Sequence, residues 1–305
     1  MQSIQSTPSL TKFAWLSILA ALITIGLKLG AYFLTNSIGL LSDALESLVN
    51  LVTAIAALVA LSIAARPADE EFSFGYSKVE YFSSGFEGGM ILIAAGSIAF
   101  TAIPRLINPQ PLGQVSLGLA VSVVASVINF GVARILSRAA RQYGSITLEA
   151  DSRHLMTDVV TTVGVIAGVG IVSLTGWERL DAIIALVVAG NILFTGLKLL
   201  RTAARGLLDV TLPQADLEGI KNILQPYEAQ GIRFHALRTR TAAALGLVSM
   251  HMLVPGTWSV KQAHELAEQI ESEIQVKLPK VMVFTHVEPI EDPASWQDRL
   301  EFTLQ

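Results

Sequence analysis

Six apolar runs, each long enough to cross a lipid bilayer as a helix, constrain this chain more than any other feature. A helix needs about 20 consecutive apolar residues to span the hydrocarbon core of a membrane. The runs cover residues 11–34, 38–64, 80–104, 113–136, 150–174 and 180–204. Only 15% of the residues are charged, which is low for a soluble globular protein. The sequence therefore predicts an α-helical membrane protein with six transmembrane helices in residues 1–208. No small-residue cleavage site accompanies the first run, so we expect a membrane span there and not a signal peptide.

The distribution of basic residues predicts how these helices are oriented. The connections between runs at 35–37, 105–112 and 175–179 contain only two basic residues, Arg105 and Arg179. Basic residues are more frequent before the first run, between the second and third runs, and after the fourth and sixth runs. By the positive-inside rule these segments and both chain termini face the cytoplasm. The compact chain, without a long histidine-rich loop, favours a multi-pass protein of the cell membrane, specifically the inner membrane of a bacterium.

The composition changes after Leu208, where charged residues return and the apolar pattern becomes that of a soluble domain. Residues 209–292 predict, in order, a helix from Pro213 to about Gln230, strands at His235–Thr239 and Gly246–Val254, a helix opened by a Ser259–Gln262 capping box and ending near Val276, and a strand at Val281–Glu288. This order indicates a small C-terminal α+β cytoplasmic domain (αββαβ, ferredoxin-like) with helices covering a sheet. Residues 293–305 are expected to form a loosely ordered tail.

Two of the apolar runs carry matching stripes of polar residues. Residues 42–50 read Ser-Asp-Ala-Leu-Glu-Ser-Leu-Val-Asn, and residues 151–158 read Asp-Ser-Arg-His-Leu-Met-Thr-Asp. A gapless alignment pairs Asp43 with Asp151, Glu46 with His154, Asn50 with Asp158 and Thr53 with Thr161. Offsets of 0, 3 and 7 residues fall within an arc of about 60° on a helix. Polar groups in lipid are costly, so such stripes face a partner helix or a water-filled cavity.

We interpret the two stripes as the halves of one site for a divalent cation in transit. Their inner positions supply four ligands, the number of a tetrahedral zinc site: Glu46, Asn50, His154 and Asp158. Three of the four are oxygen donors, which also admit Fe²⁺ or Mn²⁺. With the histidine neutral, Glu46 and Asp158 carry two negative charges, which one divalent cation neutralises. Cysteine is absent, so any metal site must use oxygen and imidazole ligands. The structural alternative is that these residues only hydrogen-bond between helices.

The chemistry of these ligands predicts how transport is driven. Metal ligands must be deprotonated, so metal binding releases protons. His154 is the ligand whose ordinary pKa lies nearest neutral pH. Cation–proton antiport is therefore the expected mode of transport. The alternative is a passive metal channel, which direct ligation by glutamate and histidine disfavours because tight sites release ions slowly.

Two other charged residues in the apolar runs, Lys28 and Glu87, also require an interpretation. Lys28 is close to the outer end of the first run, and we expect its side chain to snorkel to the membrane interface. Glu87 lies among Gly85, Gly88 and Gly89, where small residues usually allow close helix packing. A cavity-facing or proton-handling role for Glu87 is the alternative.

Several short motifs resemble those of a known family over nearly the full length of the chain. Residues 72–80 read Phe-Ser-Phe-Gly-Tyr-Ser-Lys-Val-Glu, and similar motifs follow at 237–240 (Leu-Arg-Thr-Arg), 262–264 (Gln-Ala-His) and 286–289 (His-Val-Glu-Pro). Together with six spans and paired polar stripes, they resemble the cation diffusion facilitator family. The resemblance implies a homodimeric exporter of divalent metals that works by alternating access and proton exchange. Zn²⁺ and Fe²⁺ are the first candidates, and Mn²⁺, Co²⁺ and Cd²⁺ are also admitted.

The resemblance implies a transport site made of the four inner ligands, with Asp43 and Asp151 in supporting roles one turn away. The family usually has aspartate or histidine where this chain has Glu46, and aspartate where it has Asn50. The second difference removes one negative charge from the site. A metal-sensing or metal-binding membrane protein with weakened transport therefore stays an alternative.

The resemblance also bears on the membrane boundary. Some bacterial members bind metal in the loop before the third span through histidines at the positions of Phe72 and Tyr76. We expect that loop site to be lost here, which leaves Asp69 without partners. Lys78 and Asp209 match a pair that forms a salt-bridge interlock near the dimer interface of similar bacterial transporters. The alternative for this pair is ordinary solvated charge.

The four histidines outside the apolar runs all lie in the predicted cytoplasmic domain. His235, His251, His264 and His286 align with metal ligands of zinc-binding family members, and Glu288 stands where these have aspartate. His286 and Glu288 are two residues apart on a predicted strand, so their side chains share a face. The resemblance implies a binuclear regulatory site, at which metal tightens the dimer and biases the membrane domain.

Other classes of function lack support in the sequence. There is no Walker loop, nucleophile elbow or dinucleotide fingerprint, so we do not expect an enzyme or a catalytic cofactor. The net charge of -4 indicates no nucleic-acid partner. The expected partners are a second copy of the chain, divalent metal ions, protons and the lipid bilayer.

Overall fold

A computed structural model describes residues 10–35, 38–108, 116–175 and 179–296 of the chain. The chain divides into two compact units, Met1–Arg205 and Gly206–Gln305. The first unit consists of helices and the second combines helices with a sheet.

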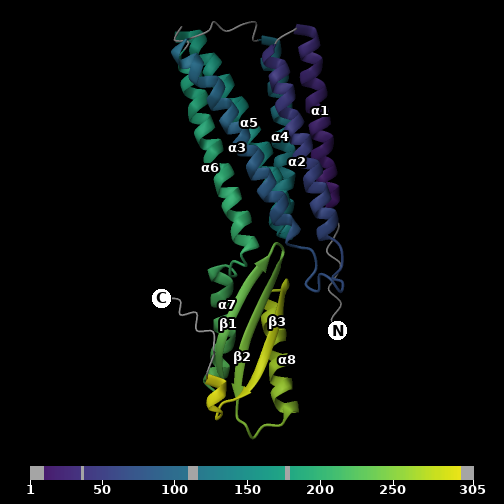
Figure 1. The fold of residues 1–305 in the computed structure, drawn as a ribbon, viewed down its shortest axis with the longest axis vertical. Helices are drawn as coiled ribbons and strands as arrows, with labels where there is room; N and C mark the ends of the chain where they lie inside the picture. The colour runs from purple at the N-terminus through teal and green to yellow at the C-terminus, as the bar shows by residue number, and fades with distance from the viewer. Residues whose placement is uncertain (1–9, 36–37, 109–115, 176–178, 297–305) are drawn as a thin grey trace. The chain divides into compact units, whose positions relative to one another are not determined.

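The helices of the first unit are shown in Figure 1. They are α1 (Thr11–Thr35), α2 (Ile38–Ala64), α3 (Val79–Ile107), α4 (Ser116–Tyr143), α5 (Ile146–Thr175) and α6 (Arg179–Leu207). At about 1.5 Å per residue, each is longer than the roughly 30 Å hydrocarbon core of a bilayer. The six predicted apolar runs are therefore confirmed as helices. The largest difference is at the end of α4, which continues through the polar turns around Arg138 and Arg141.

Within the described residues, four stretches are long and apolar enough to cross a membrane. They are Thr11–Gly30, Val79–Ile107, Ala120–Tyr143 and Ala185–Leu207. The described part of α2 contributes a shorter apolar stretch, Asn50–Ala64. Large apolar side chains such as Trp15, Phe82 and Phe100 are exposed on this unit, as expected of side chains that face lipid.

The helices pack through small residues. The strongest packing in the first unit joins α1 to α2 and α4 to α5, while α3 packs against both α2 and α5. One core cluster contains Ala14, Ala20, Ala133 and Leu136. Alanine lets helix backbones approach closely, which is how membrane helices gain contact without a hydrophobic driving force.

A glycine contact joins α3 to α6. A methyl group built on Gly88 would lie 3.1 Å from the Leu200 side chain and 3.2 Å from the backbone oxygen of Gly196. Among the described residues, a methyl group on Gly89 would meet no atom within 4 Å outside its own turn of helix. The predicted close packing at the α3 glycines is thus confirmed for Gly88, which faces α6. A methyl group on Gly85 would make an ordinary contact with the Ala203 side chain of α6 at 3.7 Å, and one on Gly89 would make no such contact within the described residues.

The second unit is a three-stranded sheet with two helices on one face (Figure 1). Its elements are α7 (Gln214–Glu228), β1 (Arg233–Ala242), β2 (Leu245–Val254), α8 (Val260–Lys277), β3 (Val281–Pro289) and a 3₁₀ turn, η1 (Pro293–Trp296). The strand order is β1-β2-β3, with β1 antiparallel to β2 and β2 parallel to β3. The parallel pair requires a crossover, which α8 provides.

The core of this unit lies between the helices and one face of the sheet. It includes Ile220 of α7, Ile270 of α8, and Val248, Met250 and Met252 of β2. These β2 residues alternate along the strand, as the sequence pattern predicted. The capping box is also confirmed, because the Ser259 side chain accepts a hydrogen bond from the Gln262 backbone N–H. The predicted helix–strand order is therefore correct.

The expectation of a loose tail from residue 293 is wrong for its first four residues. They form η1, in which Ser295 is buried and its hydroxyl donates to the Pro289 backbone oxygen at 2.8 Å. The indole N–H of Trp296 donates to the Ile290 oxygen at 3.0 Å. A serine and a tryptophan with nearby backbone acceptors are enough to fold this turn back onto the end of β3. Residues 297–305 lie outside the described part of the chain.

Candidate metal centre

The α5 stripe lies inside the helical unit. Asp151 and His154 are only 1% and 4% exposed, respectively, and Asp158 is half-buried. Their spacing on one helix places the three side chains along the same face. Burying carboxylates in this way is costly unless a partner or an ion compensates them, so the question is which groups surround the stripe.

Asp158 is bridged to two neighbouring helices by amide side chains. The Asn50 amide on α2 donates a hydrogen bond to Oδ2 of Asp158. The Asn129 amide on α4 approaches the same oxygen at 3.4 Å. The structure therefore brings together Asn50 and Asp158, as the alignment of the two stripes predicted. Asn129 was missed by the sequence reasoning, although a lone asparagine in an apolar run is a signal that could have identified it.

His154 faces α3. Its Nδ1 atom contacts Oε1 of Glu87, and both side chains are buried. The two residues are 67 positions apart in the sequence. Glu87 is thus a charged neighbour of the stripe, consistent with the alternative that it faces the site and not only a packing surface.

Asp151 faces α1. The Ser17 hydroxyl donates to its Oδ1 atom at 3.1 Å, a contact that the sequence reasoning missed because a serine in a membrane helix carries little signal. Asp151 also interacts electrostatically with Glu87 and His154, and His154 with Asp158. The α5 stripe and Glu87 therefore form one group of charges.

Three oxygen atoms around this group lack hydrogen-bond partners among the described residues. They are Oδ1 of Asn50, Oδ1 of Asn129 and Oδ2 of Asp151, and all three are buried. Buried polar atoms normally find a partner. Amide and carboxylate oxygens together with an imidazole are a donor set that fits a divalent cation.

The other half of the predicted site is only partly described. Asp43 and Glu46 belong to α2, but their side chains, like that of Thr161 on α5, lie outside the described part of the structure. Their roles as ligand and supporting residue therefore stay predictions. Thr53 is buried, and its hydroxyl donates a hydrogen bond to the Asn50 backbone oxygen at 3.0 Å. This bond lies within α2.

The prediction that Lys28 snorkels to the interface is wrong. The side chain is 8% exposed, and its ammonium group donates to the Ser47 hydroxyl on α2 at 2.6 Å. Distance along the sequence from the end of a run does not reveal which way a side chain points. Because α1 packs on α2, the lysine lies against the helix that carries the first stripe.

The prediction that Asp69 has no partners is also wrong. Its Oδ2 atom accepts from the Tyr76 hydroxyl at 2.5 Å, and its Oδ1 atom accepts from the backbone N–H groups of Phe72 and Glu71. The Tyr76 hydrogen bond is the main cause that lowers the pKa of Asp69 below its usual value. The residues that stand in place of the expected histidines therefore hold Asp69 in a turn.

A second cluster of potential ligands lies on the sheet. His235, His251 and His286 are aligned across the three strands, with ring centroids 4.9 and 5.0 Å apart. They lie on the face opposite the apolar core, because His251 alternates with Met250 and Met252 along β2. A β-bulge follows His235, and Ala236 adopts a φ of 51°. Bulges re-aim side chains near functional sites.

Glu288 joins these histidines. Its Oε2 atom lies 3.0 Å from Nε2 of His235 and 3.3 Å from Nδ1 of His251, and its Oε1 atom lies 3.5 Å from Nε2 of His286. The donor atoms of His235, His251 and Glu288 all lie within 4.8 Å of one another. Within the described residues this is the one group of three or more such side chains compact enough to hold a metal ion.

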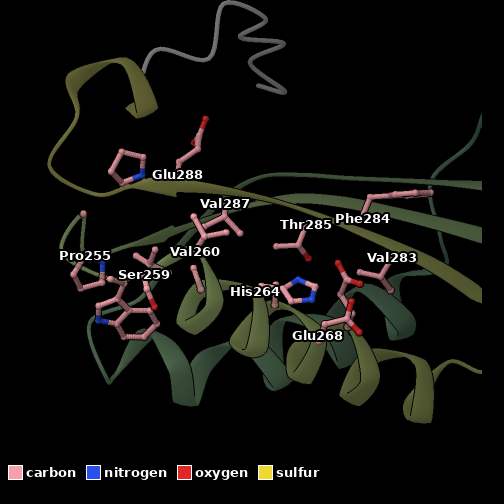
Figure 2. A pocket seen from close by; sticks show the side chains of 17 residues that line it. Pro255, Ser259, Val260, His264, Glu268, Val283, Phe284, Thr285, Val287 and Glu288 are labelled. Carbon is pink, nitrogen blue, oxygen red and sulfur yellow. The ribbon is translucent and has the colours of Figure 1, made fainter. Parts of the chain in front are cut away.

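His264 lies elsewhere in the same unit. It is on α8, where it lines an open cavity of about 730 Å³ next to β3 together with Glu268 and Thr285. Figure 2 shows His264 and Glu288 on opposite sides of the β3 ribbon. The structure thus gathers three of the four predicted histidine ligands with Glu288, and the membership of His264 in that site stays a prediction.

Asp209 pairs within its own unit. Its Oδ2 atom lies 3.3 Å from Nη1 of Arg240 on β1. Lys78 precedes α3 in the helical unit. Lys78 and Asp209 belong to different units, and the structure describes each unit by itself. The salt bridge between these two residues therefore stays a prediction.

Comparisons with known proteins bear on both units. The family model described as the cation efflux transmembrane domain matches residues 14–208. The model described as the cation efflux protein, cytoplasmic domain, matches residues 212–290. Together the two models cover nearly the whole chain.

Similar individual proteins agree with these models. The chain is 53% identical over 290 residues to an uncharacterized transporter of Synechocystis sp., covering 95% of this chain and 94% of that protein. It is 29% identical over 264 residues to the cation-efflux pump FieF of Klebsiella pneumoniae, covering 86% of this chain and 87% of that one. The solved metal-bound C-terminal domain of the CzcD transporter from Thermotoga maritima is 26% identical, with a TM-score of 0.24, and covers 27% of this chain and 99% of that domain. The chain therefore belongs to the cation efflux family of membrane transporters, the cation diffusion facilitators.

Proposed function

We propose that this protein exports a divalent metal cation, with Zn²⁺ or Fe²⁺ as the first candidates, in exchange for protons. The transport site consists of Glu46 and Asn50 on α2 with His154 and Asp158 on α5, and Asp43 and Asp151 support it. The observation that carries the proposal is the buried group of charges on α5, beside which the amide oxygens of Asn50 and Asn129 and one carboxylate oxygen of Asp151 have no partner among the described residues. A cation at this position compensates the buried carboxylates and these oxygens together.

Metal entry must rearrange contacts that the structure shows. The Asn50 amide donates to Asp158, so rotation of the amide turns its oxygen toward the cation and frees a carboxylate oxygen of Asp158. Alternating access then exposes the loaded site to the two sides of the membrane in turn.

Proton exchange supplies the driving force in this proposal. A site of carboxylates and one imidazole binds a cation or protons, but not both, because the same lone pairs of the ligands bind either one. Reprotonation on the far side therefore releases the cation. His154 is the ligand suited to this exchange near neutral pH.

The proposal is tested with the full-length protein in liposomes. Zn²⁺ uptake is followed with a trapped fluorescent indicator, with and without an imposed pH gradient. We expect a proton gradient directed opposite to zinc movement to increase the initial rate, and reversal of the gradient to slow it. A rate that does not depend on the gradient would contradict proton coupling and favour a passive channel.

We further propose that the protein works as a homodimer, which is supported by the match of residues 212–290 to the family's cytoplasmic domain. Metal bound at His235, His251 and Glu288, beside His286, then acts as a regulator. The compact arrangement of these donors supports metal binding there.

One observation favours a second candidate, a metal-binding membrane protein with weak transport. The hydrogen bond from Asn50 to Asp158 competes with the cation, and Asn50 brings no charge in return. An Asn50→Asp variant distinguishes the efficient exporter from the weakly transporting protein. The added charge should raise the transport rate of a weak transporter, whereas in an efficient exporter it should change mainly the affinity for the metal.

A further inference from the structure

We infer that Glu87 on α3 is the residue that orients His154 for metal binding. The inference rests on the proposed function, since it takes His154 to be a ligand of the transported cation. It assigns to α3 a part in a site for which the sequence supplied ligands from α2 and α5 only.

The contact between the two side chains is specific in its atoms. Oε1 of Glu87 contacts Nδ1 of His154, and both groups are almost completely buried. Among the described residues, the hydrogen bonding of this imidazole is made through Nδ1. A neutral imidazole has one N–H and one lone pair. With the N–H at Nδ1, directed to the carboxylate, the lone pair at Nε2 is left for a cation.

This arrangement has a known chemical consequence. An imidazole that binds a metal through one nitrogen usually donates its other N–H to a carboxylate, which fixes the tautomer and the ring orientation and raises the basicity of the ligating nitrogen. The added negative charge also offsets the charge that the site lacks at Asn50. Glu87 therefore acts through His154 as a positioning residue.

The backbone that carries Glu87 is held in place. The next residue, Gly88, packs so closely against α6 that a methyl group there would lie 3.2 Å from both the Leu200 backbone nitrogen and the Gly196 backbone oxygen. A carboxylate on a fixed turn of helix constrains a partner ring better than one on a mobile loop does.

A second buried glutamate on α3 provides a contrast. Glu80 accepts hydrogen bonds from the Ser145 hydroxyl and from the Thr147 backbone N–H at 3.2 Å. These groups lie at the start of α5, whose first N–H groups have no acceptor within the helix and favour a nearby carboxylate. Glu80 thus has a structural role that explains its burial, whereas Glu87 is directed at a candidate ligand.

The tautomer is the direct test. His154 is the only histidine in residues 1–205, so its ¹⁵N resonances in lipid-reconstituted, histidine-labelled protein are assigned by difference from His154→Gln. In spectra recorded at a pH where the ring is neutral, we expect the metal-free parent to be protonated at Nδ1, and added Zn²⁺ to shift the Nε2 resonance. A parent ring protonated at Nε2, or Zn²⁺ binding at Nδ1, would overturn the inference.

Transport kinetics provide the second test, with Zn²⁺ as the probe. We expect Glu87→Ala to raise the KM for Zn²⁺ by about 10- to 100-fold, and Glu87→Gln, which retains a hydrogen-bond acceptor, to raise it less. Glu71→Gln removes the same charge from an exposed loop position and should leave the KM unchanged. His154→Ala distinguishes an error in the role of Glu87 from an error in the proposed transport site. If His154→Ala abolishes transport while Glu87→Ala keeps the parental KM, the positioning role is wrong and the proposed site stands. If His154→Ala transports like the parent, the site itself is wrong.

Discussion

Asp158 shows how single residues connect the helices of this transporter. Amides from α2 and α4 converge on its Oδ2 atom, and each amide keeps an oxygen without a partner among the described residues. In the proposed site, rotation of these amides would turn their oxygens toward a cation. The residue on which this behaviour most depends is Asn50.

We expect Asn50→Asp to bind Zn²⁺ more tightly, on the order of tenfold, because affinity rises with the number of charged ligands. The same change should lower the thermal stability of the metal-free protein, since two carboxylates then face each other without a cation. Isothermal titration and thermal unfolding in a chelating buffer measure the two effects. Asn222→Asp, on the exposed surface of α7, should change neither quantity.

Tyr227 provides a residue-scale test of the cytoplasmic domain. Its hydroxyl donates to Glu273 at 2.7 Å, and burial together with this bond raises its pKa from 10.0 to about 12. The folded protein favours the protonated hydroxyl, so this group contributes its full stability below pH 10. The contribution is lost as the pH rises toward 12 and the hydroxyl ionises.

We therefore expect Tyr227→Phe to unfold more easily than the parent at pH 8, by about 1 kcal/mol. The difference in unfolding free energy should shrink between pH 10 and 12, which denaturant titrations of the two proteins over that range would detect. A difference that stays constant across this range would show that the hydroxyl is not the cause.

Individual side chains were the hardest part to predict. The placement of Asp151, His154 and Asp158 on one face of α5 followed from helix geometry alone. The burial of Lys28 against Ser47 and the three hydrogen bonds to Asp69 did not, because both depend on the direction of a side chain and on which element packs beside it.

At the scale of helices, α3 links the candidate site to α6. One turn of α3 carries Glu87, which contacts His154 on α5, and Gly88, which packs on α6. A change that moves this turn should therefore disturb the site as well as the packing.

We expect Gly88→Ala to destabilise the helical unit by about 1–3 kcal/mol, because the added methyl group overpacks the contact with α6. Gly89→Ala is the matched control, since in the described part of the chain its methyl group would meet no atom of another helix within 4 Å, and it should be neutral or slightly stabilising. Thermal unfolding of the detergent-purified variants compares the two. Equal melting temperatures for both variants would contradict the packing account.

The helices and strands themselves were largely predictable from the sequence. Which of them lie beside one another was not. Apolar length defines α1–α6, and the alternation in β2 and the capping box of α8 define elements of the sheet domain. The pairing of Glu87 with His154 joins residues 67 positions apart, and no local pattern encodes such a contact. The two matching stripes were an exception, because their similar spacing suggested that α2 and α5 face each other, which the hydrogen bond from Asn50 to Asp158 confirms.

At the scale of the whole molecule, the protein combines two units with different arrangements of potential metal ligands. In the helical unit the proposed ligands His154 and Asp158 contact Glu87 and Asn50, and these contacts would have to change for a cation to bind. The sheet unit has His235, His251 and Glu288 already within 4.8 Å of one another. This difference fits a transport site that must release its ion and a regulatory site that retains one.

We expect Zn²⁺ to raise the melting temperature of the cytoplasmic unit in the full-length protein, with about 2.7 kcal/mol of added stability when free zinc is 100 times the Kd. His251→Ala should abolish this gain, whereas His264→Ala, on the other side of the sheet, should retain most of it. Differential scanning calorimetry with and without a chelator measures the effect. A gain that survives His251→Ala would place the metal elsewhere.

The measurement that tests the central claim most directly is Zn²⁺ flux into liposomes that contain the parent, His154→Ala or Asp158→Ala protein at equal density. The account predicts zinc uptake by the parent and a loss of most of that uptake in both variants, with each variant still folded and inserted. Uptake at the parental rate in both variants would contradict the assignment of the transport site to α2 and α5.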